Sequence, residues 1–205
     1  MKRLMTGALP ALFLLVLVSR IDLAGQQGAS DGARFDGDGK LLYPADYREW
    51  VYVTSGLGMT YGPAAQAAGR QPMFDNVFVN RESYRAFQAT GQWPERTIFV
   101  LEIRSGEENV SINNGGRTQG AVRAIEVAVK DGSRFPDTTW GYFEFGAPPR
   151  IAPASTRLPA TASCYACHKN NAAVEQTFVQ FYPTLMDVAR AKGTVRADYD
   201  PARKP

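Results

Sequence analysis

Thr97–Arg104, with the sequence TIFVLEIR, is the segment that most clearly predicts a β-strand, because it is rich in β-branched and aromatic residues. Val122–Lys130 (VRAIEVAVK) and Thr139–Gly146 (TWGYFEFG) have the same character, and Met73–Val79 is a fourth candidate. Polar, Gly- and Asn-rich residues between 106 and 120 predict a loop or a wide hairpin connection. We therefore expect an antiparallel sheet of four or five strands.

A few helices accompany these strands. We expect a short helix over 45–53, a Gly/Ala/Pro-rich loop over 54–69, and a helix that Asn80 caps and that runs to about Thr90. A C-terminal helix is expected from about Ser163 towards Ala191, with a break at Pro183. Strands and helices that do not alternate regularly define an α+β fold of one domain.

The only two cysteines and the only histidine of the chain fall within Cys164-Tyr165-Ala166-Cys167-His168. C-x-x-C-H is the attachment pattern of a c-type haem. In this pattern Cys164 and Cys167 form thioethers with the haem, and His168 is the proximal ligand of the iron. The motif predicts one covalent haem c at the start of the C-terminal helix.

Two other interpretations of the motif are weaker. A C-x-x-C pair can be a redox dithiol or a disulfide, but such pairs usually open the first helix of a βαβ unit, and no such unit is predicted here. A closed structural zinc site needs four Cys or His ligands, and the chain has three.

The N-terminus indicates export. Lys2 and Arg3 precede an apolar run over 8–18, which is too short to span a membrane and is typical of a signal peptide over 1–25. Arg20 and Asp22 leave an uncleaved anchor as the alternative. We expect a periplasmic protein with a flexible arm over 26–40, a haem domain over 41–191 and a tail over 192–205.

The net charge gives no indication of a nucleic-acid partner. The whole chain carries a formal charge of +3, from 23 basic and 20 acidic residues. Three of those basic residues and one acidic residue lie in the predicted signal peptide, so the mature chain would be close to neutral.

A single histidine excludes bis-histidine ligation within one chain, so a methionine sulfur is the remaining strong candidate for the sixth ligand. Met73 and Met186 lie in predicted elements and are expected in the core. Met59 lies in a Gly-rich loop that could carry its sulfur to the iron, although most loop methionines are only packing residues.

Several segments together resemble the cytochrome P-460 and cytochrome c′-beta family. They are CYACHKNNAAVEQTFVQFYPTL at 164–185, YREWVYV at 47–53, TIFVLEI at 97–103, IEVAVKDGSRFP at 125–136 and WGYFEFG at 140–146. The resemblance spans roughly Leu41 to Leu185. It implies a mostly antiparallel β fold, a homodimer, and one high-spin haem c with an open distal side.

Two activities occur in this family. The P-460 enzymes oxidise hydroxylamine at a haem that is cross-linked to a lysine, whereas the c′-beta proteins lack the cross-link and bind NO or other diatomic gases. The resemblance places Leu101 where the enzymes have their lysine, and no lysine lies between Lys40 and Lys130. A lysine cross-link is therefore not expected.

The resemblance also matches Glu126 to the carboxylate that manages protons in the P-460 enzymes. Strand periodicity places Glu126 on one face with Ala124 and Ala128, where burial would raise its pKa. A solvated glutamate on an edge strand is the alternative. By the same periodicity Phe99 shares a face with Leu101, so both can line the distal side.

Three functions remain open on the sequence. The first is binding or redox processing of a small nitrogenous ligand such as NO. The second is electron transfer to a redox partner protein through a six-coordinate haem with Met59. The third is hydroxylamine oxidation without a cross-link. Arg104, Arg117 and Arg123 are candidates to pair with the haem propionates.

Overall fold

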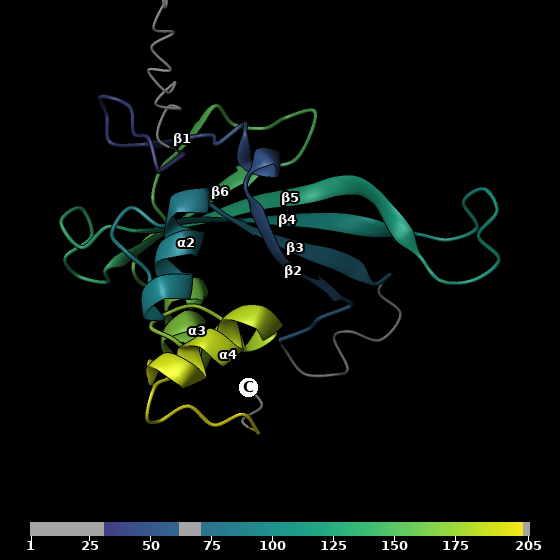
Figure 1. Cartoon of the computed structure of the whole chain (residues 1–205). Helices are drawn as coiled ribbons and strands as arrows, with labels where there is room; N and C mark the ends of the chain where they lie inside the picture. The colour runs from purple at the N-terminus through teal and green to yellow at the C-terminus, as the bar shows by residue number, and fades with distance from the viewer. Residues whose placement is uncertain (1–30, 62–70, 203–205) are drawn as a thin grey trace, which may run out of the picture.

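A computed structural model describes residues 31–61 and 71–202. It confirms the predicted α+β fold, with two antiparallel sheets (Figure 1). The larger sheet has the order β2-β3-β4-β5-β6, and the smaller one pairs β1 with β7. The strands are β1 Leu41–Leu42, β2 Val51–Leu57, β3 Met73–Val79, β4 Ile98–Glu107, β5 Thr118–Lys130, β6 Trp140–Gly146 and β7 Ala154–Ser155.

The centre of the larger sheet is the antiparallel pair of β4 and β5. Both strands extend further into the connection than the sequence predicts, so the connecting segment is only 108–117. Each element of this sheet follows its neighbour in sequence, as expected of antiparallel strands joined by local connections. Neither β4 nor β5 is an edge strand.

The helical elements are η1 Tyr47–Glu49, α2 Arg81–Thr90, α3 Ser163–Asn171, η2 Val179–Phe181 and α4 Pro183–Lys192. The expected helix α2 is confirmed, and Gly91 ends it in the left-handed conformation, with a φ of 74°. Asn80 precedes α2, but its side-chain oxygen accepts a hydrogen bond from the backbone of Ile98 rather than capping the helix. Asn80 therefore ties α2 to the start of β4.

Two helix predictions are wrong. The helix expected over 45–53 is a single 3-10 turn followed by β2, which pairs with β3. The long C-terminal helix is two helices, because the chain leaves helical geometry between Asn171 and Pro183. Pro183 starts α4 rather than interrupting it, a position where its missing N–H costs nothing. The strand β2 also occupies part of the loop expected over 54–69; residues 62–70 of that loop lie outside the described residues.

The strand alternation divides the hydrophobic side chains between two clusters. Phe99 of β4 belongs to the cluster that packs against α2, α3 and α4. Ile98 and Val100 of the same strand belong to the cluster on the reverse face, beneath the segment that carries Tyr47 and Trp50. In Figure 1, α3 and α4 lie together on one side of the larger sheet. The sheet thus separates two cores.

The segments that flank the domain make defined contacts where the structure describes them. Phe35, in the predicted arm, packs edge-on against Phe143. After α4, the backbone N–H of Arg196 donates to the carbonyl of Ala173 at 2.9 Å. The predicted signal peptide lies outside the described residues. Among the helices that are described, none combines the length and hydrophobicity needed to cross a membrane.

Candidate haem site

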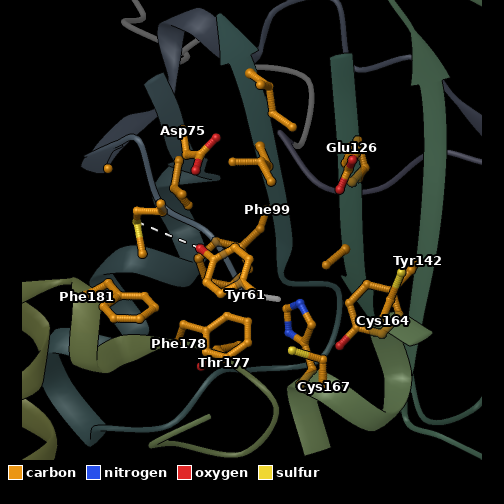
Figure 2. Close-up of a pocket in the computed structure, with 18 of the residues that line it drawn as sticks. Tyr61, Asp75, Phe99, Glu126, Tyr142, Cys164, Cys167, Thr177, Phe178 and Phe181 are labelled. Carbon is orange, nitrogen blue, oxygen red and sulfur yellow. Dashed lines mark hydrogen bonds between the residues drawn. The ribbon is translucent and has the colours of Figure 1, made fainter. Parts of the chain in front are cut away.

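A cavity of about 780 Å³ lies between the larger sheet and the C-terminal segments. One wall consists of side chains from β2 to β6, and the other consists of α3 and the residues that follow it (Figure 2). The aromatic residues that line it are Tyr61, Phe99, Tyr142, Phe143, Phe178, Phe181 and Tyr182. A concave, largely aromatic site of this volume is suited to a large planar ligand.

Helix α3 places the whole C-x-x-C-H motif at the cavity. Cys164, Cys167 and His168 all line it, because residues three and four apart lie on the same face of a helix. The two thiols are not joined in a disulfide. Both thiols and the imidazole therefore face the same space, as covalent attachment and ligation of one haem require.

A backbone hydrogen bond fixes the orientation of His168. Its Nδ1 lies 2.8 Å from the carbonyl oxygen of Gln176. Because a carbonyl only accepts, this contact requires the proton on Nδ1 and leaves the lone pair on Nε2. The ring also packs against Tyr142 and Phe178, with centroid distances of 4.7 and 4.4 Å. Burial lowers the pKa of His168, which favours the neutral imidazole that a metal ligand needs.

The segment between α3 and η2 thus has a positioning role that the sequence did not suggest. Gln176 follows Glu175, which adopts a positive φ of 51°. Thr177, the next residue, accepts a hydrogen bond from the buried indole N–H of Trp93 at 2.8 Å. These contacts hold the carbonyl of Gln176 beside His168.

The residues of the cavity fit a haem group. The hydroxyl of Tyr142 is buried at the cavity without a hydrogen-bond partner among the described residues, which is costly unless a bound group or water supplies one. Cys164, Cys167 and His168 would hold the haem, and the aromatic walls would pack against its faces. When bound, the haem supplies an iron centre that can bind small ligands or change oxidation state.

The sheet wall brings together the three predicted distal residues. Phe99 and Leu101 of β4 and Glu126 of β5 all line the cavity, and Leu101 pairs directly with Glu126 across the two strands. Glu126 is half-buried on a central strand of the sheet. The alternative of a solvated glutamate on an edge strand is therefore wrong.

Burial and neighbouring carboxylates raise the pKa of Glu126. Burial is the largest cause, and the negative charges of Glu144 and Asp75 add to it. Burial also raises the pKa of Asp75 to about 6. Asp75 lies on β3 in the same cavity, yet we did not predict it as a site residue. The alternation of Asp75 with Val77, whose strand partner is Leu101, is the signal that could have identified it.

Met59 also lines the cavity, next to β2 and β3. The Tyr61 hydroxyl donates to its sulfur at 3.8 Å. A Cβ at Gly56 would come within 2.1 Å of the same sulfur, so the missing side chain of Gly56 makes room for Met59. Met186 is buried in the core as expected. Met73 is not a core residue, since it is 37% exposed and lines the cavity.

None of the three arginines predicted to pair with haem propionates lines the described part of the cavity. Arg104 forms an ion pair with Glu102 at 2.6 Å, and Arg117 forms one with Glu108. Arg123 is exposed.

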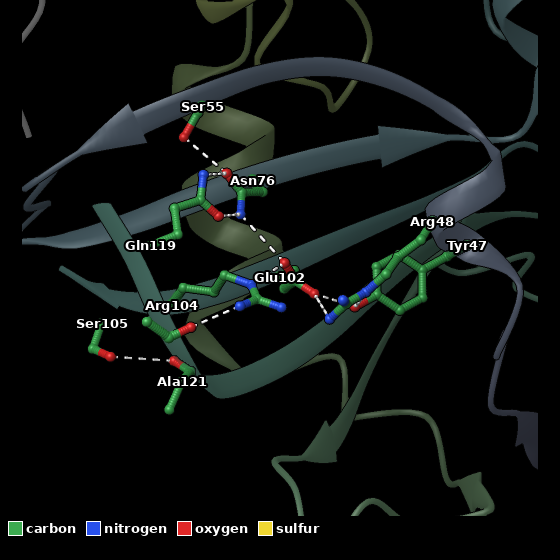
Figure 3. Close-up of polar contacts among 10 residues, drawn as sticks. Tyr47, Arg48, Ser55, Asn76, Glu102, Arg104, Ser105, Gln119 and Ala121 are labelled. Atoms are coloured by element: carbon green, nitrogen blue, oxygen red, sulfur yellow. Dashed lines mark hydrogen bonds and ion pairs between the residues drawn. The ribbon is translucent and has the colours of Figure 1, made fainter. Parts of the chain in front are cut away.

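The ion pair of Arg104 belongs to a polar network on the reverse face of the sheet (Figure 3). Glu102 is 3% exposed and also accepts hydrogen bonds from Tyr47, Arg48 and Asn76. Burial alone would raise the pKa of Glu102, but the hydrogen bonds from Arg104 and Tyr47 and the charge of Arg48 lower it overall. The network lies behind the cavity and meets its described lining at Ser55, whose hydroxyl donates to Asn76 at 2.9 Å.

The fold and the C-x-x-C-H motif at an aromatic cavity are those of a haem-binding domain of the α+β class. The family model of Cytochrome P460 matches residues 44–179. The chain belongs to this family, which makes it a haem-binding cytochrome. A search of curated proteins finds no significant match.

Proposed function

We propose that this protein is an exported cytochrome with one covalent haem c that binds a small nitrogenous ligand such as NO. The observation that carries the proposal is the shared cavity of His168, Leu101 and Glu126. His168 and the two cysteines enter it from α3, whereas Leu101 and Glu126 enter it from the sheet. The proposed ligand site lies between these two walls.

Each side of the cavity has a different task in this proposal. On the α3 side, the carbonyl of Gln176 keeps the His168 lone pair directed away from the backbone. On the sheet side, Phe99 and Leu101 provide an apolar surface that keeps water away from a bound ligand. Glu126 provides the one ionisable group on β5 at the cavity, and burial, together with the charges of Glu144 and Asp75, raises its pKa above that of a solvated glutamate, which suits a group that exchanges protons with a ligand.

The absorption spectrum of the purified holoprotein tests this function. We expect a high-spin ferric haem, and a ferrous haem that reacts with CO and NO. The pyridine haemochrome should show two thioether attachments, and Cys164→Ala should leave one. A low-spin ferric spectrum with no reaction towards CO or NO would contradict the proposal.

Hydroxylamine oxidation is the second candidate, favoured by the half-buried Glu126 at the cavity wall. A carboxylate with a raised pKa can accept protons from a bound hydroxylamine as electrons leave it for an external acceptor. Turnover of hydroxylamine with an artificial electron acceptor tests this candidate. We propose that it proceeds without a lysine cross-link, because no lysine lines the described part of the cavity.

Export is part of the proposal. Members of this family are typically exported, and the apolar run over 8–18 has the length of a signal-peptide core. Expression of the full chain followed by fractionation should place the haem-stained protein in the periplasm. Intact mass should show that the residues before about Gln26 have been removed. Retention of the full mass in the membrane fraction would indicate an uncleaved anchor instead.

A further inference from the structure

The carboxyl groups that line the cavity are not balanced by basic side chains. Asp75, Glu126 and Glu144 line the cavity, whereas no lysine or arginine is among its described lining residues. Within residues 31–61 and 71–202, none of these three carboxyl groups has a hydrogen bond or an ion pair to another side chain. The cavity therefore presents negative charge that no described residue neutralises.

The arrangement of the three carboxyl groups is itself unfavourable for folding. Glu126 pairs directly with Glu144 across β5 and β6, and like charges in that position repel each other. Asp75 lies two strands from Glu126, on β3, and its charge contributes to the raised pKa of Glu126. Figure 2 shows Asp75 and Glu126 on strands on opposite sides of the one that carries Phe99.

The reverse face of the same sheet shows that the fold can neutralise such groups. Glu102 follows Leu101 directly in sequence, yet it points to the other face and is bound by Arg48 and Arg104. Two of the elements that carry the unpaired carboxyl groups, β3 and β5, also supply partners to that network, in Asn76 and Gln119. The three carboxyl groups at the cavity are thus unpaired, whereas Glu102 on the reverse face is paired. This contrast indicates that the unpaired groups have a role in the site.

We propose that Asp75, Glu126 and Glu144 form a charge filter that admits uncharged or protonated nitrogenous ligands to the cavity and disfavours small anions such as azide and nitrite. The inference rests on the proposed function, since it specifies which ligands reach the same site. Half-buried Asp75 and Glu126 act within the cavity wall, and exposed Glu144 acts at its rim. A carboxylate in a partly desolvated site repels an anion more strongly than it would in water.

Ligand titration of the ferric holoprotein tests the filter. The probes are azide as the anion and imidazole as the neutral ligand, both at about pH 8 and constant ionic strength. This pH lies well above the pKa of about 6 for Asp75, so its carboxyl group is ionised. The dissociation constants are read from the absorption spectrum for the wild type, Asp75→Asn, Glu126→Gln and Glu144→Gln.

We expect Asp75→Asn and Glu126→Gln each to tighten azide binding about 10-fold, the size expected for one nearby charge in a partly screened site. Glu144→Gln should tighten it by a smaller factor, because Glu144 is exposed at the rim and its charge is screened. Imidazole binding should stay within about twofold of the wild type, because a neutral ligand has no net charge to repel. The matched control is Glu82→Gln, which removes one negative charge from the exposed face of α2. It should leave both dissociation constants unchanged.

Two results would contradict the charge-filter proposal. One is an unchanged azide affinity in all three variants, and the other is an equal change for azide and imidazole, which would indicate altered access. If a variant does not fold, the wild type still tests the idea: azide binding should strengthen as inert salt screens the carboxylates, and imidazole binding should not. Failure of the ferrous wild type to bind CO or NO would instead reject the proposed function.

Discussion

Leu101 lies directly opposite Glu126 in the antiparallel register of β4 and β5, and both side chains line the cavity that contains His168. Side chains directly opposite each other on neighbouring strands are within contact distance. The position that the family resemblance assigns to a cross-linking lysine is thus adjacent to the carboxylate that it assigns to proton transfer. The side chain at position 101 therefore borders the same part of the cavity as Glu126.

Leu101→Lys should create a haem cross-link in the holoprotein. The new amine would lie opposite Glu126 at the cavity wall, where the carboxylate attracts its cation. After oxidative treatment we expect a red-shifted absorption band and a covalent link between the haem and the peptide that carries the substitution, detected by mass spectrometry. Ile103→Lys is the matched control, because it adds the same group to the same strand face but pairs with Ala124. A cross-link in the control alone would show that the family's lysine is matched to the wrong position.

Glu126→Gln should lower any hydroxylamine turnover by about 10²-fold, the usual contribution of a positioned acid–base group. Glutamine keeps the size of the side chain but cannot accept a proton. The measurement is the steady-state rate with an artificial electron acceptor, with Glu82→Gln as a control of equal charge change. The rate of the wild type should rise with pH through the range in which Glu126 ionises, because the carboxylate is the form that accepts the proton. A rate that is equal in wild type and Glu126→Gln would exclude this role.

Met59→Ala should leave the ferric spectrum high-spin and nearly unchanged. The sulfur of Met59 is packed over Gly56 and accepts a hydrogen bond from Tyr61, so it already has partners on the β2 side of the cavity. The measurement is the ferric absorption spectrum, in which methionine ligation would add a methionine–iron charge-transfer band. If the wild type shows a methionine–iron band and the variant loses it, the protein is an electron-transfer cytochrome.

Glu102→Gln should destabilise the protein by about 2 kcal/mol at neutral pH, because a buried charged acceptor with several donors is replaced by a neutral one. The native pKa of Glu102 lies below its usual value of 4.5, so ionisation stabilises the native state above that pH. This stabilisation is lost as the pH falls through the native pKa. Chemical unfolding at about pH 7 and about pH 3 should therefore show a difference between wild type and variant that shrinks on acidification. Glu82→Gln should show no such difference at either pH.

The strands of the sheet were predictable where alternation was regular, and β2 was missed where it was not. Tyr47, Trp50 and Val51 recur at helical spacing, but the chain turns only once at η1 and then pairs with β3. A register irregularity between Tyr52 and Thr54 breaks the alternation that would have indicated a strand. Strand pairing, which the local sequence does not show, decides this segment.

That the three residues of the C-x-x-C-H motif share one cavity was predictable because the motif is local, whereas the rest of the site depends on contacts between distant residues. Cys164, Cys167 and His168 lie close together on the single helix α3. Asp75 reaches the same cavity only because β3 pairs with β4, and Glu102 is neutralised by Arg48 from a segment 54 residues away in sequence. Neither of these environments can be predicted from the residues that flank the two carboxyl groups.

The contact between His168 and Gln176 has a consequence for how the protein can vary. The acceptor is a main-chain carbonyl, which any residue at position 176 would supply, and the Gln176 side chain helps to anchor it by donating to the carbonyl of Thr138 at 2.9 Å. By contrast, the opposite wall is built from side chains such as Leu101 and Glu126, each of which one substitution can change. Substitutions on the sheet can therefore change reactivity while the side that carries His168 stays constant, which makes this scaffold a suitable starting point for directed evolution of new haem chemistry.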